Sequence, residues 1–141
     1  NLSRGRTVEL ITKIDPSIAD YPIMKLILQP IVENAIYHGI EQMAEDTNIY
    51  IKGRVEGNDC VIEITDAGRG MTEEEMAQLR QKIAGELDSS GGSGNGIGLK
   101  NVQDRIQIAF GGAYGIEVAS QIGCYTKIIV RIPMTHMGEA E

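Results

Sequence analysis

Apolar residues follow two different periods along this chain, and the order of the two patterns restricts the fold more than any other feature. Alternating patterns predict strands at residues 7–14, 47–55, 60–65, 116–119 and 125–132. Apolar residues three or four positions apart predict helices at residues 22–40, after residue 72, and at 97–110. Strands and helices do not alternate regularly, as βαβ units would. We therefore expect an α+β fold: a two-layer sandwich in which helices cover one face of a mixed, mainly antiparallel sheet.

The first predicted helix contains Pro30 in its interior. Proline lacks the backbone N–H and clashes with the preceding helical turn. We therefore expect a short turn of helix before Pro30 and the main helix after it, ending at Gly39. The pair Asp15-Pro16 is expected to break the chain after the first strand.

Local signals mark the boundaries of the other elements. Residues 56–59, Glu-Gly-Asn-Asp, have the composition of a hairpin turn. Thr72 and Glu75 match the spacing of a capping box, which predicts a helix start. The inward positions of the last two helices should be Met76, Leu79 and Ile83, then Leu99, Val102, Ile106 and Ala109. Gly111-Gly112 should end the last helix, and the Gly- and Ser-rich residues 85–96 should form a mobile loop.

Size and charge limit the classes of function. We expect 141 residues to form a single domain, with a core at about 7–133 and a tail at 134–141. The net charge of −7 argues against nucleic acid as a partner, because phosphate neutralisation dominates such binding. A small anion can still bind through backbone N–H groups, a few cations and a metal ion.

The cysteines and the apolar runs indicate the cellular compartment. Cys60 and Cys124 are far apart and form no CxxC motif, so we expect two buried, small apolar residues in a reducing cytoplasm. No apolar run approaches the ~20 residues of a membrane span, and no signal peptide is evident. We expect this chain to stay out of the membrane, with any anchor of a parent protein upstream.

The first candidate cluster spans residues 29–39, Gln-Pro-Ile-Val-Glu-Asn-Ala-Ile-Tyr-His-Gly. Asn34 and His38 are four residues apart and share a helix face. An amide oxygen and an imidazole placed in this way can meet a metal ion and a phosphate. Taken alone, His38 is better explained as a residue at the negative end of a helix dipole.

The second cluster is Asp66-x-Gly68-x-Gly70 at the end of a predicted strand. A carboxylate at this place can accept a hydrogen bond from an exocyclic amine, and the glycines let a flat ligand approach the backbone. The alternative is a simple turn in which Asp66 caps the local backbone.

The third cluster spans residues 92–101, Gly-Ser-Gly-Asn-Gly-Ile-Gly-Leu-Lys-Asn, and opens onto a helix. Glycines before a helix N-terminus present free N–H groups to an anion. The spacing is not that of a Walker A loop, and the dinucleotide fingerprint would need a preceding strand. The alternative is a flexible linker that contains glycine.

In this order and spacing, the three clusters resemble the N, G1 and G2 boxes of the GHKL ATPases. That superfamily includes gyrase, heat-shock chaperones, histidine kinases and mismatch-repair ATPases, which share the Bergerat fold. Residues 28–39 and 96–102 are similar to the LytS/YesM-like branch of sensor histidine kinases. The resemblance extends from about Thr7 to Pro133.

The resemblance implies a site for ATP and Mg²⁺. Asn34 matches the protein ligand of Mg²⁺, His38 a polar position near the phosphates, and Asp66 the acceptor from adenine N6. The remaining positions match the walls of the adenine pocket and the phosphate-binding amides: Gly68, Gly70, Met71 and Thr126, then Gly94, Gly96, Gly98 and Leu99. Lys100 and Arg105 either help to neutralise phosphate or are simply solvated.

Two departures from the family pattern concern catalysis. Hydrolysing GHKL enzymes carry a general-base Glu four residues before the Asn, where this chain has Pro30. Glu33 is the candidate catalytic carboxylate beside Asn34, either polarising or purely structural. Ala67 occupies a position that is often Asn in the family.

The implied function is the ATP-binding catalytic domain of a two-component sensor histidine kinase. Its partners would be the dimerisation and phosphoacceptor helices of the parent kinase and, indirectly, a response regulator. Neither His38 nor His136 belongs to such a hairpin, so we expect little or no autophosphorylation by this chain alone. Two alternatives remain: an anti-sigma-factor serine kinase of the same superfamily, and a GHKL module that only binds proteins.

Overall fold

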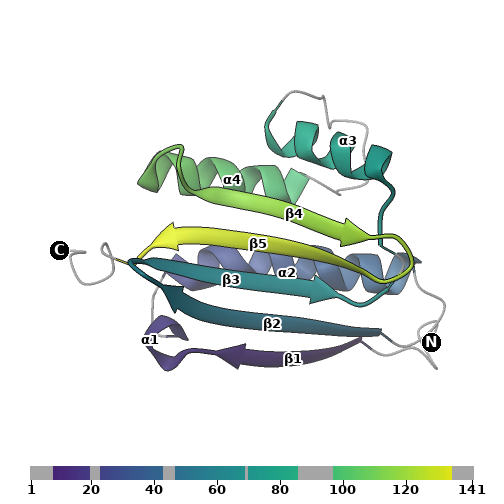
Figure 1. Cartoon of the computed structure of the whole chain (residues 1–141), viewed down its shortest axis with the longest axis horizontal. Helices are drawn as coiled ribbons and strands as arrows, with labels where there is room; N and C mark the ends of the chain where they lie inside the picture. Colours follow the sequence, from purple (N-terminus) through teal and green to yellow (C-terminus); the bar gives the residue numbers. More distant parts are fainter. Residues whose placement is uncertain (1–7, 20–22, 43–46, 69, 86–96, 135–141) are drawn as a thin grey trace.

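The structure is a computed structural model that describes residues 8–19, 23–42, 47–68, 70–85 and 97–134. Its elements, in chain order, are β1 (Val8–Ile14), α1 (Pro16–Ala19), α2 (Ile23–Gln42), β2 (Thr47–Glu56), β3 (Asp59–Asp66), α3 (Glu73–Ile83), α4 (Ile97–Phe110), β4 (Gly115–Gln121) and β5 (Tyr125–Pro133). The strands form one sheet in the order β1-β2-β3-β5-β4 (Figure 1). The pair β1–β2 is parallel, and the other neighbouring pairs are antiparallel.

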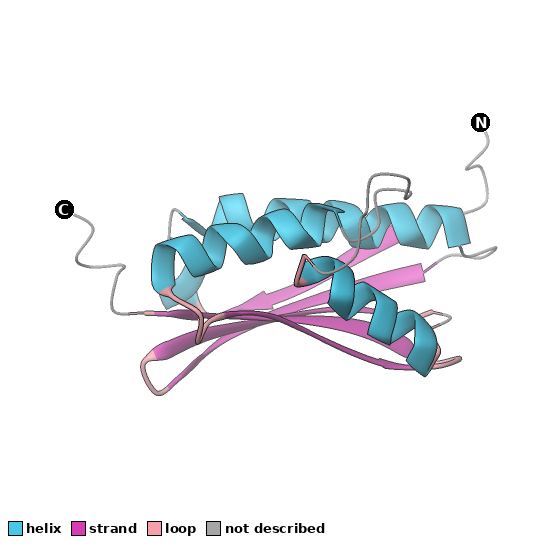
Figure 2. Ribbon diagram, turned by 90° about the horizontal axis from the view of Figure 1, so that it is seen from above, coloured by secondary structure: helices cyan, strands magenta, loops and turns pink. Residues whose placement is uncertain are grey.

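The helices lie on one face of this sheet, which confirms the predicted two-layer α+β sandwich (Figure 2). α2 and α4 pack against each other and against the sheet, and α3 packs against α4 and β4. The core between the layers is aliphatic, as expected for a chain with one Phe and no Trp. The sheet contributes Ile49, Ile51, Cys60, Ile62, Ile64, Val118, Ile128, Val130 and Ile132 to it, and the helices contribute Ile18, Ile27, Ile31, Ala35, Leu79, Ile83, Leu99, Val102 and Ile106.

The predicted break at Pro30 is wrong, because α2 is a single helix from Ile23 to Gln42 and Gly39 does not end it. Ile27 and Ile31, on either side of Pro30, are fully buried. A proline costs about 3 kcal/mol inside a helix. Burial of each isoleucine contributes about 1.5–3 kcal/mol. Packing of both halves on the same core therefore offsets the missing hydrogen bond.

The chain after β1 forms the short helix α1, which the sequence reading treated only as a break. Pro16 occupies its first position, where the missing N–H costs nothing. The Asp15 carboxylate accepts hydrogen bonds from the Ser17 backbone N–H at 2.9 Å and from its hydroxyl at 2.8 Å. These bonds lower the pKa of Asp15. Ile18 is fully buried, so the short helix closes one end of the core.

The predicted hairpin turn and the predicted helix boundaries at Thr72 and Gly111 are confirmed, whereas the predicted mobile loop at 85–96 lies, apart from Gly85, outside the described residues. The capping box at Thr72 is complete: the Glu75 N–H donates to Thr72 Oγ1 at 3.1 Å, and the Thr72 N–H donates to Glu75 Oε1 at 2.9 Å. α4 spans the predicted residues and ends where the Gly111 N–H donates to Gln107 O. Ala109, predicted to face inward, is exposed.

The opposite face of the sheet carries ion pairs. Arg131 contacts Glu56 at 3.0 Å and Asp59 at 2.9 Å, and Arg54 contacts Glu56 at 2.8 Å and Glu63 at 3.0 Å. The half-exposed arginines identify this as the solvent face, where water and salt screen such pairs and leave them little effect on stability. No helix in the described part of the chain is long and apolar enough to cross a membrane.

Candidate functional site

Asp66 is the last residue of β3 and lies on the helix-covered face of the sheet. Side chains alternate along a strand, so Asp66 shares its face with the buried residues Ile62 and Ile64. Its partners in the neighbouring strands are Ile49 of β2 and Thr126 of β5. A half-buried carboxylate thus continues an apolar row, and burial of such a group is unfavourable unless it is hydrogen-bonded. Asp66 therefore lies where the apolar row of the covered face ends.

The segment after Asp66 is held against the β4–β5 hairpin. Gly70 is buried and has φ +69°, a left-handed conformation that favours glycine. A Cβ atom at Gly70 would lie 2.2 Å from the carbonyl oxygen of Gln121, so no other residue fits without backbone movement. The next residue, Met71, donates its N–H to Ser120 Oγ at 2.7 Å. The backbone at this motif is therefore fixed from the far edge of the sheet.

Ser120 is a site residue that the sequence reading missed. Its hydroxyl donates to Tyr125 O at 2.7 Å and lies 3.3 Å from Thr126 Oγ1. Ser120 and Thr126 are partners across the β4–β5 hairpin. The sequence does predict a turn between the last two strands. Once the strand register is known, that turn places Ser120 opposite Thr126.

α2 carries the residues of the first cluster. Asn34 is half-buried beside the buried row formed by Ile27, Ile31 and Ala35. Glu33 is exposed, and its Oε2 accepts a hydrogen bond from Gln29 Nε2 at 3.0 Å. This bond within the helix favours the structural interpretation of Glu33 over a catalytic one. His38 belongs to α2, but its side chain lies outside the described residues.

α4 begins inside the third cluster. Gly98 lies in its first turn, while Gly94, Gly96 and the rest of residues 86–96, like His136, lie outside the described residues. The Leu99 side chain is fully buried, so only its backbone can meet an anion. Lys100 Nζ forms an ion pair with Asp104 at 2.7 Å. Arg105 is exposed on the same helix.

The described parts of the three clusters lie toward the same end of the molecule. In Figure 1, the C-terminal half of α2, the N-terminus of α4, the end of β3 and the start of β5 all point to the right-hand side. α2 packs against both α4 and β3. The elements that carry the three clusters thus approach one end of the sandwich, where α4 presents the positive end of its helix dipole.

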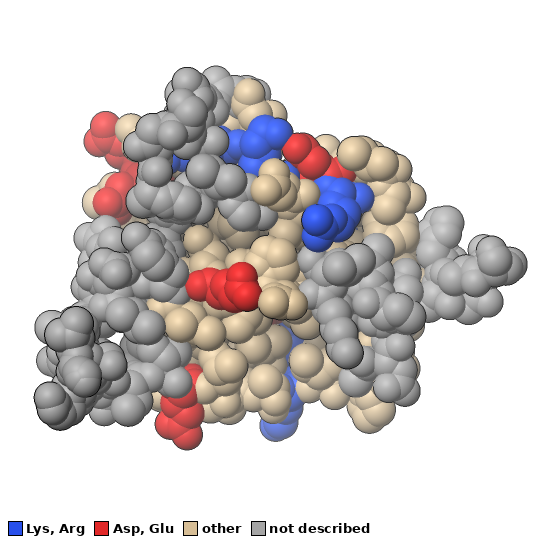
Figure 3. Space-filling view, turned by 180° about the vertical axis from the view of Figure 1, so that it is seen from behind, with Lys and Arg blue, Asp and Glu red and all other residues tan. Residues whose placement is uncertain are grey.

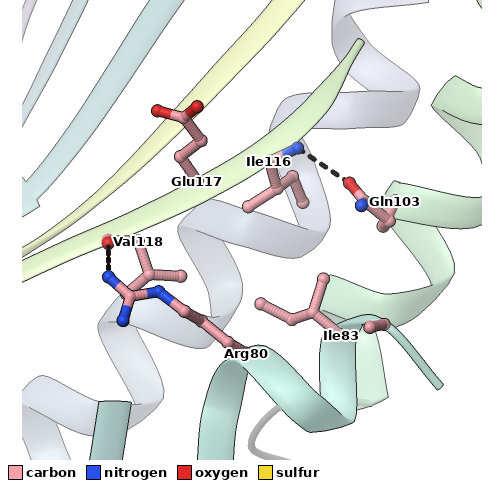
Figure 4. Close-up of a pocket in the computed structure, with 7 residues that line it drawn as sticks. Arg80, Ile83, Gln103, Ile116, Glu117 and Val118 are labelled. Atoms are coloured by element: carbon pink, nitrogen blue, oxygen red, sulfur yellow. Dashed lines mark hydrogen bonds between the residues drawn. The ribbon is translucent and has the colours of Figure 1, made fainter. Parts of the chain in front are cut away.

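A separate cavity of about 340 Å³ lies between α3, α4 and the edge strand β4 (Figure 4). Arg80 Nη2 donates to Val118 O at 2.9 Å, and Gln103 Oε1 accepts from the Ile116 N–H at 2.7 Å. These two side chains occupy polar groups of the sheet edge that another strand could otherwise pair with. None of the predicted site residues within the described part of the chain lines this cavity.

The charges on the helix side are mixed. Figure 3 shows Lys and Arg side chains beside carboxylates over α3 and α4, with uncharged residues between the other described charges. The described residues contain no group of three or more His, Cys, Asp or Glu that could hold a metal ion. A metal ion held with the help of a ligand's phosphates and one amide oxygen remains compatible with these side chains, because Mg²⁺ commonly binds through few protein oxygens.

Comparisons with known proteins give concordant results. The family model of the histidine kinase-, DNA gyrase B- and HSP90-like ATPases matches residues 19–136. The sensor histidine kinase BtsS of Escherichia coli (strain K12) is 36% identical over 106 residues, which are 75% of this chain and 16% of BtsS. The sensor histidine kinase YesM of Bacillus subtilis (strain 168) is 34% identical over 120 residues, 85% of this chain and 18% of YesM. The chain thus spans less than a fifth of either relative.

Solved structures share the fold. The catalytic domain of histidine kinase ThkA has a TM-score of 0.63 at 16% identity, with 90% of this chain and 79% of that chain covered. ThkA in complex with the response regulator protein TrrA has a TM-score of 0.60 at 18% identity, with 90% and 34% covered.

Proposed function

The chain belongs to the family of histidine kinase-, DNA gyrase B- and HSP90-like ATPases, and we propose that it binds Mg-ATP as the catalytic domain of a sensor histidine kinase. The motif resemblance to the LytS/YesM-like branch is confirmed by the sensor kinases among its relatives. In this proposal the γ-phosphoryl group passes to a histidine on a separate dimerisation domain.

The observation that carries the proposal is the position of Asp66. It is a carboxylate on the covered face of the sheet, directly opposite Thr126 and followed by the fixed Gly70 backbone. An acceptor at this place can bind the exocyclic amine of adenine. The backbone that follows it is held in place where Gly70 packs against Gln121.

The phosphates would lie toward α2 and α4. The first turn of α4 offers backbone N–H groups and a positive dipole end to the phosphate oxygens. Asn34 would supply an amide oxygen to Mg²⁺, which neutralises charge on the phosphates when bound. Lys100 adds little charge of its own, because Asp104 already pairs with it.

Phosphoryl transfer needs positioning and charge stabilisation more than covalent chemistry from the protein. The described residues fit a mechanism without a general base from the protein. Glu33 is hydrogen-bonded to Gln29, and Pro30 occupies the position of the general base in hydrolysing relatives. A kinase benefits from this arrangement, because water is then poorly activated. The acceptor helices and, indirectly, a response regulator are the proposed partners, and the chain would act on the cytoplasmic side of a membrane-anchored parent.

Calorimetry with a non-hydrolysable ATP analogue tests the proposal. We expect binding that depends on Mg²⁺, and an Asn34→Ala variant that loses this dependence. Asn58→Ala, in the exposed β2–β3 turn, is the matched control and should bind like the wild type. Absence of binding by the folded wild-type chain at millimolar analogue would refute the proposal.

A second assay addresses transfer. With radiolabelled ATP, the chain alone should remain unlabelled, while addition of the dimerisation domain of its parent kinase should give a labelled histidine on that domain. Strong labelling of the chain itself would contradict the proposed role.

A further inference from the structure

We infer that Ser120 is a positioning residue that makes the site selective for adenine by fixing the direction in which the Thr126 hydroxyl can hydrogen-bond. The inference rests on the proposed nucleotide site and goes beyond it, because Ser120 itself would not touch the base. It follows from the hydrogen-bond partners of one half-buried hydroxyl group.

The single proton of the Ser120 hydroxyl is already committed. Ser120 Oγ lies 2.7 Å from Tyr125 O, and a carbonyl oxygen can only accept. The Met71 N–H approaches the same Oγ at 2.7 Å and can only donate. The Ser120 hydroxyl therefore donates its one hydrogen bond to Tyr125 O. Toward all other groups it can only accept.

This assignment fixes the Thr126 proton as well. Ser120 Oγ and Thr126 Oγ1 are 3.3 Å apart, and Ser120 has no second proton to give. Thr126 must then be the donor in this contact. Its hydroxyl has one proton, so toward any other group, including a ligand, Thr126 presents only lone pairs.

Thr126 and Asp66 occupy opposed positions of β5 and β3, with both side chains on the helix-covered face. Opposed residues in an antiparallel pair have Cβ atoms about 4.5–5.5 Å apart. The base edge thus meets two neighbouring acceptors, a carboxylate and a hydroxyl lone pair. Adenine offers an amino group with two protons at this edge, whereas hypoxanthine offers a carbonyl oxygen and one ring N–H.

Removal of the Ser120 hydroxyl would release Thr126. Its hydroxyl could then rotate and donate to the carbonyl oxygen of hypoxanthine, while the ring N–H of that base donates to Asp66. Ser120→Ala should therefore weaken discrimination against hypoxanthine, and Ser120→Thr, which keeps a hydroxyl, should preserve it.

The test is calorimetric titration of the 141-residue chain with Mg-ADP and Mg-IDP, from which the ratio of the two dissociation constants is obtained. In Ser120→Ala we expect the preference for ADP to fall about tenfold, the value of roughly one hydrogen bond. Ser120→Thr should restore the wild-type preference. Ser17→Ala, which removes a hydroxyl from α1, should leave it unchanged.

Thr126→Val provides an independent test, because it leaves the Ser120 bonds to Met71 and Tyr125 in place. It should also reduce the preference for ADP, and adding Ser120→Ala to it should change the preference no further. This variant answers the question even if Ser120→Ala does not fold.

If Ser120→Ala or Thr126→Val lost affinity for both nucleotides in equal proportion, the inference about selectivity would be overturned. The proposed function, nucleotide binding by this chain, would still stand. Wild-type binding of IDP as tight as that of ADP would also overturn the inference. Failure of the wild type to bind either nucleotide would instead refute the proposed function, and the inference with it.

Discussion

Asp66 and Thr126 are opposed residues of adjacent antiparallel strands, and both face the helical layer at the end where β3 stops and β5 begins. Further along the same strands, the positions on this face are filled by Ile64 and Ile128, which belong to the core. The polar pair therefore marks the place where the apolar core of the sandwich ends, and where we propose that the base binds.

Asp66→Asn should weaken binding of Mg-ATP analogues roughly 10- to 150-fold, because a hydrogen bond to a charged group is worth about 1.5–3 kcal/mol. Calorimetry measures this loss directly. Glu63→Gln is the matched control: it makes the same chemical change on the same strand, but on the solvent face, where Glu63 pairs with Arg54 and Lys127. An equal loss of affinity in both variants would show that Asp66 does not contact the base.

The order and type of most elements can be predicted from the sequence, because each element has a strong local signal. Alternation in β3 and β5, and the capping box at Thr72, are properties of a few neighbouring residues. The predicted break at Pro30 was wrong because the free-energy cost of a proline in a helix is a local property. The compensating burial of Ile27 and Ile31 depends on tertiary packing. Helical spacing allows either Ala109 or Phe110 to follow Ile106 on the inward face, and in the structure Phe110 packs against the core.

The site was predictable to the extent that its residues form motifs. Asp66 and Gly70 stand in a recognisable pattern, and the structure shows the positive φ that the glycine provides. Ser120 has no motif, because its role arises only from strand register, which pairs it with Thr126 and brings Met71 to its hydroxyl.

Gly70→Ala should lower the free energy of unfolding by about 2–5 kcal/mol, since left-handed backbone costs about 1–2 kcal/mol and the steric conflict with Gln121 adds about 1–3. Gly57→Ala separates the two effects. Gly57 also has positive φ, at 60°, but an added Cβ there meets nothing within 4 Å. Its loss in urea unfolding should be only about 1–2 kcal/mol, and equal losses at both positions would contradict the contact with Gln121.

Thr72→Ala should destabilise the protein by about 1 kcal/mol, because it removes the acceptor for the Glu75 N–H at the start of α3. Thr72→Ser keeps that acceptor and should cost much less. The urea midpoints of the two variants show how far each substitution lowers the free energy of unfolding. An equally large loss in Thr72→Ser would indicate that the methyl group, and not the cap, stabilises this helix start.

The two cysteines should differ sharply in reactivity. Cys60 is fully buried in the core, and burial, assisted by the nearby Asp15 and Asp59 carboxylates, raises the pKa of its thiol from 9.0 to about 11. Cys124, which the sequence predicted to be buried, is instead exposed, because it lies in the β4–β5 turn and not within a strand. A thiol reagent at pH 8 should therefore modify one cysteine in the native protein and both in denaturant, because the thiolate is the reactive form.

The same shift makes stability depend on pH. Below pH 9 the Cys60 thiol is protonated in both states and contributes no slope. Between about pH 9 and 11 the unfolded chain releases this proton while the folded chain retains it, so the free energy of unfolding should fall as pH rises. Cys60→Ala should flatten that part of the urea-midpoint profile, whereas Cys124→Ala should leave it unchanged. Rapid labelling of Cys60 in the native protein at pH 8, or an unaltered profile in Cys60→Ala, would contradict a buried, protonated thiol.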